Sequence, residues 1–200
     1  MTDRLTESEL TFNPRESGFP LLNMEELFGN TNPVILEIGS GKGRFLLSTA
    51  MERPDVNLIG IEKSLHYHRV IRDRFLKRDL RNVRLINYDA FVVLQKMIPD
   101  ASLAEVHIYF PDPWPRKRER KRRIIRPEAL EEMRRVLVDG GMGIYVTDHE
   151  EYFDSAAPLV EAAFPRSERR IPGPDDPPRT NYEAKYREEG RPIFEIRFWK

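Results

Sequence analysis

The segment with the most evident chemistry is Phe110-Pro-Asp-Pro-Trp-Pro115, which places a carboxylate and an indole among three prolines. Proline fixes its own backbone φ angle and restricts the residue before it, so the segment has few conformations. This stiffness predicts that Asp112 and Trp114 hold defined positions. The alternative is a rigid turn that carries an ordinary exposed aspartate and a packed tryptophan.

A dense run of positive charge follows this segment directly. Eight basic residues and one acid, Glu119, lie between Arg116 and Arg126, whereas the whole chain has a formal net charge of zero. Such a run is usually only a solvated surface. Here it lies inside the chain beside a carboxylate and an aromatic side chain, which suits a nucleobase held next to its phosphate backbone. The pattern therefore predicts a local RNA-binding surface on a protein that is not basic overall.

A second set of candidates begins with three closely spaced glycines, Gly39, Gly41 and Gly43. Glycines allow a tight turn and let backbone amides approach a ligand. Glu62 and Asp89 each follow a later apolar run, where a carboxylate can accept hydrogen bonds from ribose or approach adenine. A nicotinamide dinucleotide would use similar geometry. The GxGxG spacing, together with Glu37, whose charge would repel a pyrophosphate, favours S-adenosylmethionine instead.

Short apolar runs alternate with amphipathic stretches and must position these side chains. Strands are predicted over residues 34–38, 57–61, 83–88, 103–110 and 142–147. Helices are predicted over 44–52, 64–81, 90–97, 127–137 and 149–164. Gly140-Gly141 should follow the end of the fourth helix, and Pro158 should kink or restart the fifth. This alternation predicts an α/β fold with a doubly wound, mostly parallel sheet.

The two ends of the chain follow other patterns. Residues 1–30 are polar, with turn signals at Asn13-Pro14 and Gly18, and are expected to form an N-terminal arm that supplies short elements. Residues 31–200 are expected to form a single domain. Residues 171–178 are predicted as a proline-rich loop. Residues 193–199 alternate with period two, which predicts a half-buried, antiparallel C-terminal strand near the sheet edge.

Several classes of function are disfavoured by composition. The chain has no cysteine, which excludes disulfides, thiolate metal ligands and cysteine nucleophiles. No stretch approaches the roughly 18 apolar residues of a membrane span, and residues 1–10 lack the apolar region of a secretory signal. His66 and His68 would face different directions on a helix, so a metal pair is not expected. We therefore expect a cytoplasmic protein without a metal or a membrane segment.

From about Phe12 to Trp199 the sequence resembles the bacterial tRNA (guanine-N7-)-methyltransferases. The most specific matches are FPDPWPRKRERKRR, from Phe110 to Arg123, and the late TNYE motif. LEIGSGKG, IGIEKS and NYDA support them. The resemblance implies a class I S-adenosylmethionine-dependent methyltransferase with a Rossmann-like fold, acting on the guanosine at position 46 in the variable loop of tRNA. We expect tRNA as the partner and a monomer or homodimer as the assembly.

The resemblance also implies roles for single residues. Asp112 would be the catalytic carboxylate. The cofactor site would consist of Glu37, Gly39, Gly41, Glu62, Asp89 and Asp112. Substrate contacts would come from Arg116, Asp148, Thr180, Asn181, Tyr182 and Glu183. RNA contacts would come from Arg118, Glu119, Arg120, Lys121, Arg122 and Arg123.

The chemistry of this target fits the candidate residues. Guanine N7 carries no proton, so its methylation needs no general base and depends mainly on positioning. Asp112 is expected to accept hydrogen bonds from the Watson–Crick donors of guanine and to offset the charge that the purine acquires. Two other functions fit the sequence less well. They are methylation of a protein or small molecule, and RNA binding without a cofactor.

Overall fold

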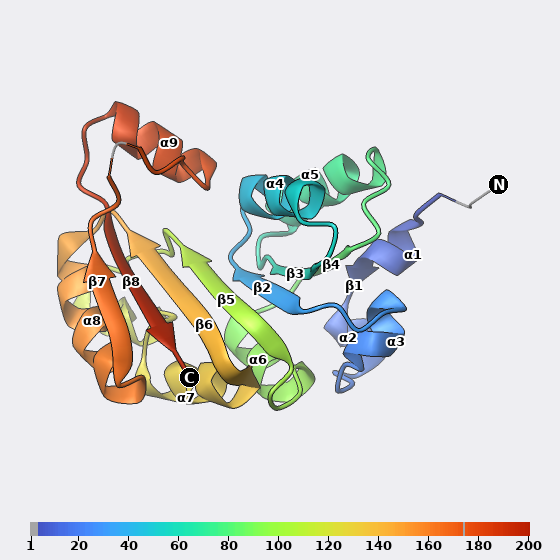
Figure 1. Ribbon diagram of the computed structural model, residues 1–200, viewed down its shortest axis with the longest axis horizontal. Helices are drawn as coiled ribbons and strands as arrows, with labels where there is room; N and C mark the ends of the chain where they lie inside the picture. The colour runs from blue at the N-terminus through green and yellow to red at the C-terminus, as the bar shows by residue number, and fades with distance from the viewer. Residues whose placement is uncertain (1–3, 174) are drawn as a thin grey trace.

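The computed structural model describes residues 4–173 and 175–200, which form one eight-stranded sheet between two layers of helices (Figure 1). The strands are β1 Thr11–Phe12, β2 Val34–Ile38, β3 Asn57–Ile61, β4 Val83–Ile86, β5 Leu103–Tyr109, β6 Leu137–Thr147, β7 Arg166–Arg170 and β8 Phe194–Trp199. The α-helices are α1 Glu7–Leu10, α2 Pro14–Ser17, α3 Met24–Phe28, α4 Arg44–Glu52, α5 Leu65–Leu76, α6 Ala90–Met97, α7 Pro127–Val136, α8 Glu150–Ala163 and α9 Asn181–Glu188. A 3₁₀ helix, η1, covers Lys117–Arg122.

The strand order is β1-β4-β3-β2-β5-β6-β8-β7. Strands β1 to β6 pair in parallel, whereas β8 is antiparallel to both of its neighbours, β6 and β7. The predicted doubly wound sheet with an antiparallel C-terminal strand is therefore confirmed. The order reverses between β2 and β5, and ligands of such sheets bind beyond the carboxyl ends of the strands at this switch point.

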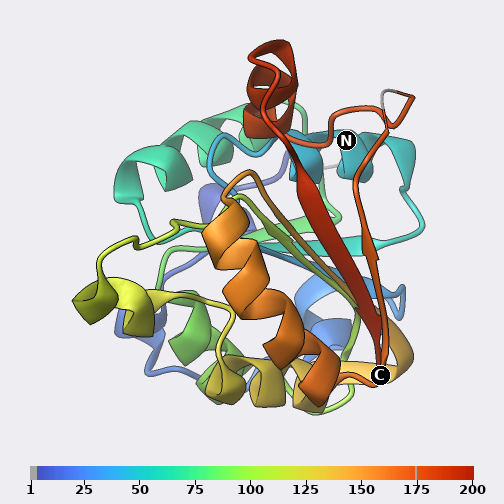
Figure 2. The ribbon, with the colours of Figure 1, turned by 90° about the vertical axis from the view of Figure 1, so that its left-hand side faces the viewer.

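Each face of the sheet carries its own apolar cluster. Leu36 and Ile38 of β2 pack with side chains of α6, α7 and α8, and Figure 2 shows α8 lying along this face. Ile35, on the opposite side of the same strand, packs with α4 and α5. All five residues of β2 are buried, as expected for a parallel strand covered on both sides.

The N-terminal residues described by the structure contribute to both layers. Leu5 and Leu10 are buried with α4 and α5, whereas Leu22 is buried with α6. Asn13 and Asn23 cap the short helices α2 and α3 with their side chains, as turn-forming residues commonly do. The predicted short elements are therefore present. Residues 1–3 of the predicted arm lie outside the described residues.

One strand boundary differs from its prediction, and at Pro158 one of the two predicted outcomes is excluded. The strand predicted to begin at residue 142 begins at Leu137, which pairs with Leu103, and the pairing resumes between Glu105 and Met142 after an irregularity. The glycine pair therefore lies inside an irregular strand instead of in a separate loop. At Pro158 the helix α8 does not restart. The carbonyl that loses its partner there belongs to the exposed Asp154, where water can replace the missing donor.

Two C-terminal elements were not predicted at all. Strand β7 consists of Arg-Ser-Glu-Arg-Arg, and α9 buries only the side chain of Glu183, so neither has an apolar period. Because β7 forms the outer edge, β8 is the second strand from this edge, which agrees with its predicted place near the sheet edge. Pro174, within the predicted proline-rich loop, lies outside the described residues.

Candidate functional site

A cleft of about 1220 Å³ opens beyond the carboxyl ends of strands β2 to β6. Residues far apart in the sequence line it, namely Gly39, Gly41, Glu62, Asp89 and Asp112. Side chains of the basic run line its rim, including Lys121 and Arg122. Pockets for one small molecule commonly measure roughly 300–1,000 Å³, so this cleft has room for a cofactor and a second group.

The glycine turn forms the floor at the end of β2. Gly43 has a φ of 71°, in the left-handed region that glycine adopts without strain. A Cβ atom added at Gly43 would lie 2.6 Å from the Cγ2 atom of Ile71. This glycine therefore lets α5 pack directly against the turn, which was not evident from the spacing of the motif.

Glu62 joins this turn to the start of α5. Its Oε2 atom accepts a hydrogen bond from the backbone amide of Gly41 at 2.8 Å. Its Oε1 atom accepts one from the amide of Ser64 at 2.7 Å. Each carboxylate oxygen can accept a further bond, so Glu62 can fix the turn and still receive a ligand hydroxyl.

Asp89 follows the neighbouring strand β4 and caps α6 at its N-terminus. Its Oδ1 atom accepts hydrogen bonds from the amides of Phe91 and Val92, at 3.1 and 3.3 Å. Its Oδ2 atom pairs with the Nζ atom of Lys63 at 3.1 Å. The capping interaction holds the carboxylate at a helix N-terminus, so its position is set by the fold.

Glu37 lies beneath the turn and does not line the cleft itself. It is buried, and its Oε2 atom has no hydrogen-bond partner among the described residues. Burial raises the pKa of Glu37 to about 8, and the nearby carboxylate of Glu62 adds to this effect. A buried acceptor without a partner is costly, so this position suits a ligand that brings positive charge above the turn.

The segment that carries Asp112 has a strained residue on each side of this aspartate. Phe110 and Trp114 have φ angles of 49° and 43°, in a region that bulky residues rarely occupy. Each such residue costs about 1–3 kcal/mol and persists only where its surroundings enforce it. Asp112 itself is exposed, and within residues 4–173 and 175–200 its carboxylate has no hydrogen-bond or ion-pair partner. It is therefore available to a ligand.

Arg123 holds the strained segment in place. Its Nε atom donates to the carbonyl oxygen of Pro113 at 2.8 Å, and its Nη2 atom pairs with Glu151 at 2.7 Å. The guanidinium also lies over the ring of Tyr152, 4.3 Å from the ring centre. Only 5% of Arg123 is exposed, so this residue, expected to contact RNA, is engaged inside the protein.

Replacement of Arg123 by methionine is expected to lower the free energy of unfolding by about 1–3 kcal/mol, because the partly buried carbonyl oxygen of Pro113 and its other acceptors lose their donor. Arg120→Met is the matched control, since Arg120 pairs with the same Glu151 at 3.1 Å but is exposed. Midpoints of urea denaturation would compare the two variants. Equal midpoints would show that Arg123 does not clamp the segment.

The other basic residues form the rim of the cleft. Residues 117–122 wind into η1, which projects from the body of the protein, yellow in Figure 2. The guanidinium of Arg122 stacks over the ring of Trp114 at 4.8 Å. Arg116 is exposed and 3.8 Å from Glu119, and neither lines the cleft. Arg118 is fully on the surface of η1.

The late TNYE motif divides into structural and exposed residues. Thr180 caps α9 by accepting a hydrogen bond from the amide of Glu183 at 3.0 Å. Glu183 is completely buried and pairs with Arg179. Tyr182 is 43% exposed and lines the cleft, whereas Asn181 is exposed outside it. The motif therefore brings one of its four residues to the cleft.

The cleft also contains residues that the sequence did not reveal. Arg191 lines it and pairs with the predicted Asp148 at 3.0 Å. Tyr186 lines it as well, in ring contact with Phe110 at 5.4 Å. Its position one turn after Tyr182 was a usable signal, because residues four apart share a helix face. The pairing of Arg191 with Asp148 had no counterpart in the sequence pattern.

Across the described part of the chain, no helix combines the length and apolar character needed to cross a bilayer. Nor do three or more His, Asp or Glu side chains of those residues gather as a metal site requires.

Comparison with known proteins places this geometry in context. A family model described as "Putative methyltransferase" matches residues 31–196. The tRNA (guanine-N(7)-)-methyltransferase of Aliivibrio fischeri is 36% identical over 184 residues, which cover 89% of this chain and 77% of that relative.

Solved structures show the same fold at lower identity. A phosphoethanolamine N-methyltransferase of Haemonchus contortus, in complex with S-adenosyl-L-methionine, has a TM-score of 0.60 at 12% identity, over 88% of this chain and 51% of that one. The aminoglycoside resistance methyltransferase NpmB1 has a TM-score of 0.60 at 21% identity, over 89% of this chain and 93% of that one. The fold is that of the class I S-adenosylmethionine-dependent methyltransferases.

Proposed function

The chain belongs to the family of bacterial tRNA (guanine-N7-)-methyltransferases, and on that premise we propose how its cleft methylates tRNA. The enzyme transfers the methyl group of S-adenosylmethionine to guanine N7, and the proposed target is the guanosine at position 46 in the variable loop. The observation that supports this most is the meeting of Gly41, Glu62, Asp89 and Asp112 in one cleft with a basic rim. Residues 31–200 would carry the activity as one domain, in the cytoplasm.

The residues at the strand ends fit the cofactor. When bound, S-adenosylmethionine supplies an electrophilic methyl group on a positively charged sulfur. Glu62 and Asp89 offer carboxylate acceptors at the ends of two neighbouring strands, and Gly39 and Gly41 of the turn line the same cleft. Glu37, buried with an unpartnered oxygen, would in its ionised form offset the positive charge of the bound cofactor.

Asp112 would orient the acceptor base. Guanine N7 presents a lone pair and no proton, so no side chain has to act as a base. Asp112 has no hydrogen-bond or ion-pair partner among the described residues and can accept hydrogen bonds from the donors on the Watson–Crick edge of guanine. Its charge would also offset the positive charge that the purine gains. Asp148 and Tyr182 would complete the substrate side, while Thr180 and Glu183 act by holding α9.

The proposed RNA surface is the rim without Arg123. Among the described residues, Arg118, Lys121 and Arg122 of this rim form no ion pair, whereas Arg116 and Arg120 beside them pair with Glu119 and Glu151. The stacking of Arg122 on Trp114 gives the rim a flat surface that a base could extend.

Replacement of Arg118, Lys121 and Arg122 by glutamine is expected to raise KM for tRNA and to flatten its dependence on salt. Each lost phosphate contact removes about 0.7–0.9 from the slope of log affinity against log salt. Affinity for S-adenosylmethionine should not change. The same replacement at Lys96, Arg134 and Arg166, near the amino ends of the strands, is the control. If the slope of affinity against salt is the same in the two triple variants, η1 does not contact the RNA.

Cofactor binding is expected to depend on pH through Glu37. Since its pKa is about 8, the carboxyl is largely protonated at neutral pH, and a cationic ligand favours the ionised form. Affinity should therefore rise between about pH 7 and pH 8, with proton release that calorimetry detects in buffers of different ionisation enthalpy. The Glu37→Gln variant should lose this dependence on pH. If its affinity still depends on pH, the proton released on binding comes from another group.

The same group affects the ligand-free protein with the opposite sign. An ordinary glutamate has a pKa of 4.5, so the unfolded chain releases a proton that the folded protein keeps up to about pH 8. The free energy of unfolding should therefore fall as the pH rises through this interval.

The proposed function is tested by mapping modified nucleosides in tRNA after incubation with the enzyme and S-adenosylmethionine. N7-methylguanosine at position 46 is the expected product. Methylation of another base, or of a protein in place of tRNA, would overturn the assignment.

A further inference from the structure

Helix α9 is held over the cleft mainly by charge. Glu183 is its one fully buried side chain, and its apolar packing comes from Tyr186, which is partly buried against the cluster that contains Ile35. Yet this helix brings Tyr182 and Tyr186 to the cleft wall. Figure 1 shows α9 standing off the sheet beyond the ends of β7 and β8. Its position therefore depends largely on the polar contacts around Glu183, with the ring of Tyr186 as its apolar contact.

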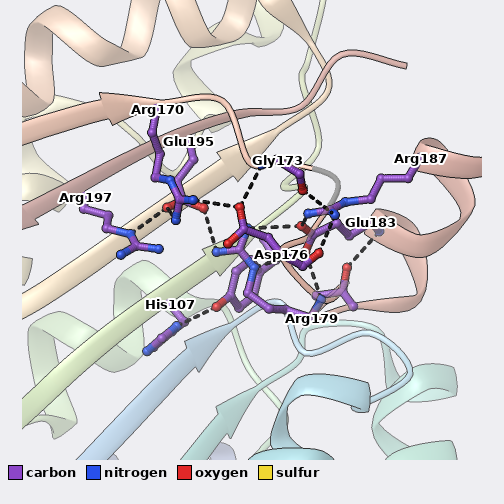
Figure 3. Close-up of polar contacts among 11 residues, drawn as sticks. His107, Arg170, Gly173, Asp176, Arg179, Glu183, Arg187, Glu195 and Arg197 are labelled. Carbon is purple, nitrogen blue, oxygen red and sulfur yellow. Dashed lines mark hydrogen bonds and ion pairs between the residues drawn. The ribbon is translucent and has the colours of Figure 1, made fainter. Parts of the chain in front are cut away.

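Arg179, just before α9, makes the direct connection between this helix and the sheet. Its Nε atom donates to Glu183 at 3.1 Å, and its Nη1 atom donates to Glu195 of β8 at 2.7 Å (Figure 3). The guanidinium also lies over the ring of Tyr109, 5.2 Å from the ring centre. Tyr109 lines the cleft at the end of β5, so one side chain contacts α9, β8 and the site.

Each of the two buried carboxylates, Glu183 and Glu195, also pairs with a second arginine. Glu183 also pairs with Arg187 at 2.7 Å, and Glu195 also pairs with Arg197 at 2.6 Å. Although burial alone would raise the pKa of Glu183, the hydrogen bonds and charge of Arg179, together with a hydrogen bond from Arg187, lower the pKa. Loss of Arg179 would therefore leave each carboxylate with a cation while the direct link between them disappears.

A longer path connects the same elements through the preceding loop. Arg187 donates to the carbonyl oxygen of Asp176, whose carboxylate pairs with Arg170 at 2.7 Å. Arg170 in turn lies 3.5 Å from Glu195. This path depends on the loop backbone, whereas Arg179 joins the two buried carboxylates itself.

We propose that Arg179 is a positioning residue for methyl transfer, which fixes α9 and through it the wall of the cleft formed by Tyr182. The inference rests on the proposed function, since Tyr182 is assigned to the side of the acceptor base. Arg179 itself touches neither substrate nor cofactor. Its effect on the reaction comes from the placement of α9.

The test is the Arg179→Met variant, which keeps the length of the side chain and removes the bridge. Since a misplacement of about 1 Å can cost about 100-fold in rate, kcat/KM for tRNA is expected to fall by about that factor. The dissociation constant of S-adenosylmethionine should stay within twofold. Amide hydrogen exchange should accelerate in residues 181–188 and remain unchanged in β6.

Arg169→Met is the matched control. Arg169 also binds a carboxylate through two nitrogens, that of Glu161, but on an exposed surface away from the cleft. It should leave activity and exchange unchanged. Arg179→Lys, which keeps the charge and can reach one carboxylate, should recover part of the lost kcat/KM. If Arg179→Met does not fold, this lysine variant is measured in its place.

A double-mutant cycle separates positioning from other effects. If Arg179 acts through Tyr182, the losses of Arg179→Met and Tyr182→Ala should not add. Additive losses, or lost activity without faster exchange in α9, would overturn the proposal. Failure of the proposed function is recognised separately, because the wild-type enzyme would then not methylate tRNA. The amide exchange of α9 would still show whether Arg179 fixes this helix.

Discussion

Asp112→Ala is expected to lower kcat for tRNA methylation by about 100- to 1,000-fold, the loss typical when one preorganised electrostatic group is removed. The carboxylate is exposed on the cleft wall, has no partner within the described chain and lies in a strained segment. These features indicate a group kept free for a ligand. Affinity for S-adenosylmethionine should weaken only moderately, because the proposed cofactor contacts of Glu62 and Asp89 come from other strands.

The measurement is single-turnover methylation of tRNA with cofactor affinity determined by calorimetry. Asp55→Ala is the control, since Asp55 is exposed in the turn before β3, at the opposite end of the sheet from the cleft. Near-normal turnover of Asp112→Ala would show that the base is oriented by other groups, with Asp148 as the next candidate.

Gly43→Ala is expected to reduce the free energy of unfolding by about 3 kcal/mol and to weaken cofactor binding strongly. The left-handed backbone alone costs an alanine about 1–2 kcal/mol. The new methyl group would also meet the side chain of Ile71 at 2.6 Å, and such overpacking typically adds 1–3 kcal/mol. Because α5 must shift, the bond from Ser64 to Glu62 should be disturbed as well.

Gly29→Ala is the matched control for this substitution. Gly29 has a φ of 70°, and a Cβ atom there would meet no atom within 4 Å. The two variants share the backbone strain, so the difference between their denaturation midpoints isolates the contact with α5. If both variants lose the same free energy of unfolding, α5 moves away from the new methyl group without an energetic cost.

The repeated strands and helices were predictable because their burial follows a simple period. Strands β2 and β3 match the predicted ranges, and so do helices α4 and α6. Convergence of the site was predictable for a related reason, since the carboxyl ends of parallel strands meet at one edge of a sheet. Glu62, Asp89 and Asp112 follow three such strands and line one cleft.

The features that could not be predicted are those in which a contact between distant parts of the chain decides where a charged residue lies. Nothing in the basic run distinguishes the buried Arg123 from its exposed neighbours, because its burial is set by Glu151 and Pro113. Helix α9 lacks an apolar stripe, so its periodicity gave no signal. Its start did carry one, because Thr180 and Glu183 have the spacing of a helix-capping pair.

The arginine-rich strand β7 has a consequence for assembly. An outer strand with unpaired backbone groups is a template on which another chain can add, which leads to aggregation. In β7 four of the five side chains are charged, and three of them are arginines, so a second copy of β7 pairing here would face like charges. The opposite border, β1, is only two residues long and is followed by Asn13-Pro14. Association of two copies would therefore have to use helices or loops, and the sheet itself resists growth into fibrils.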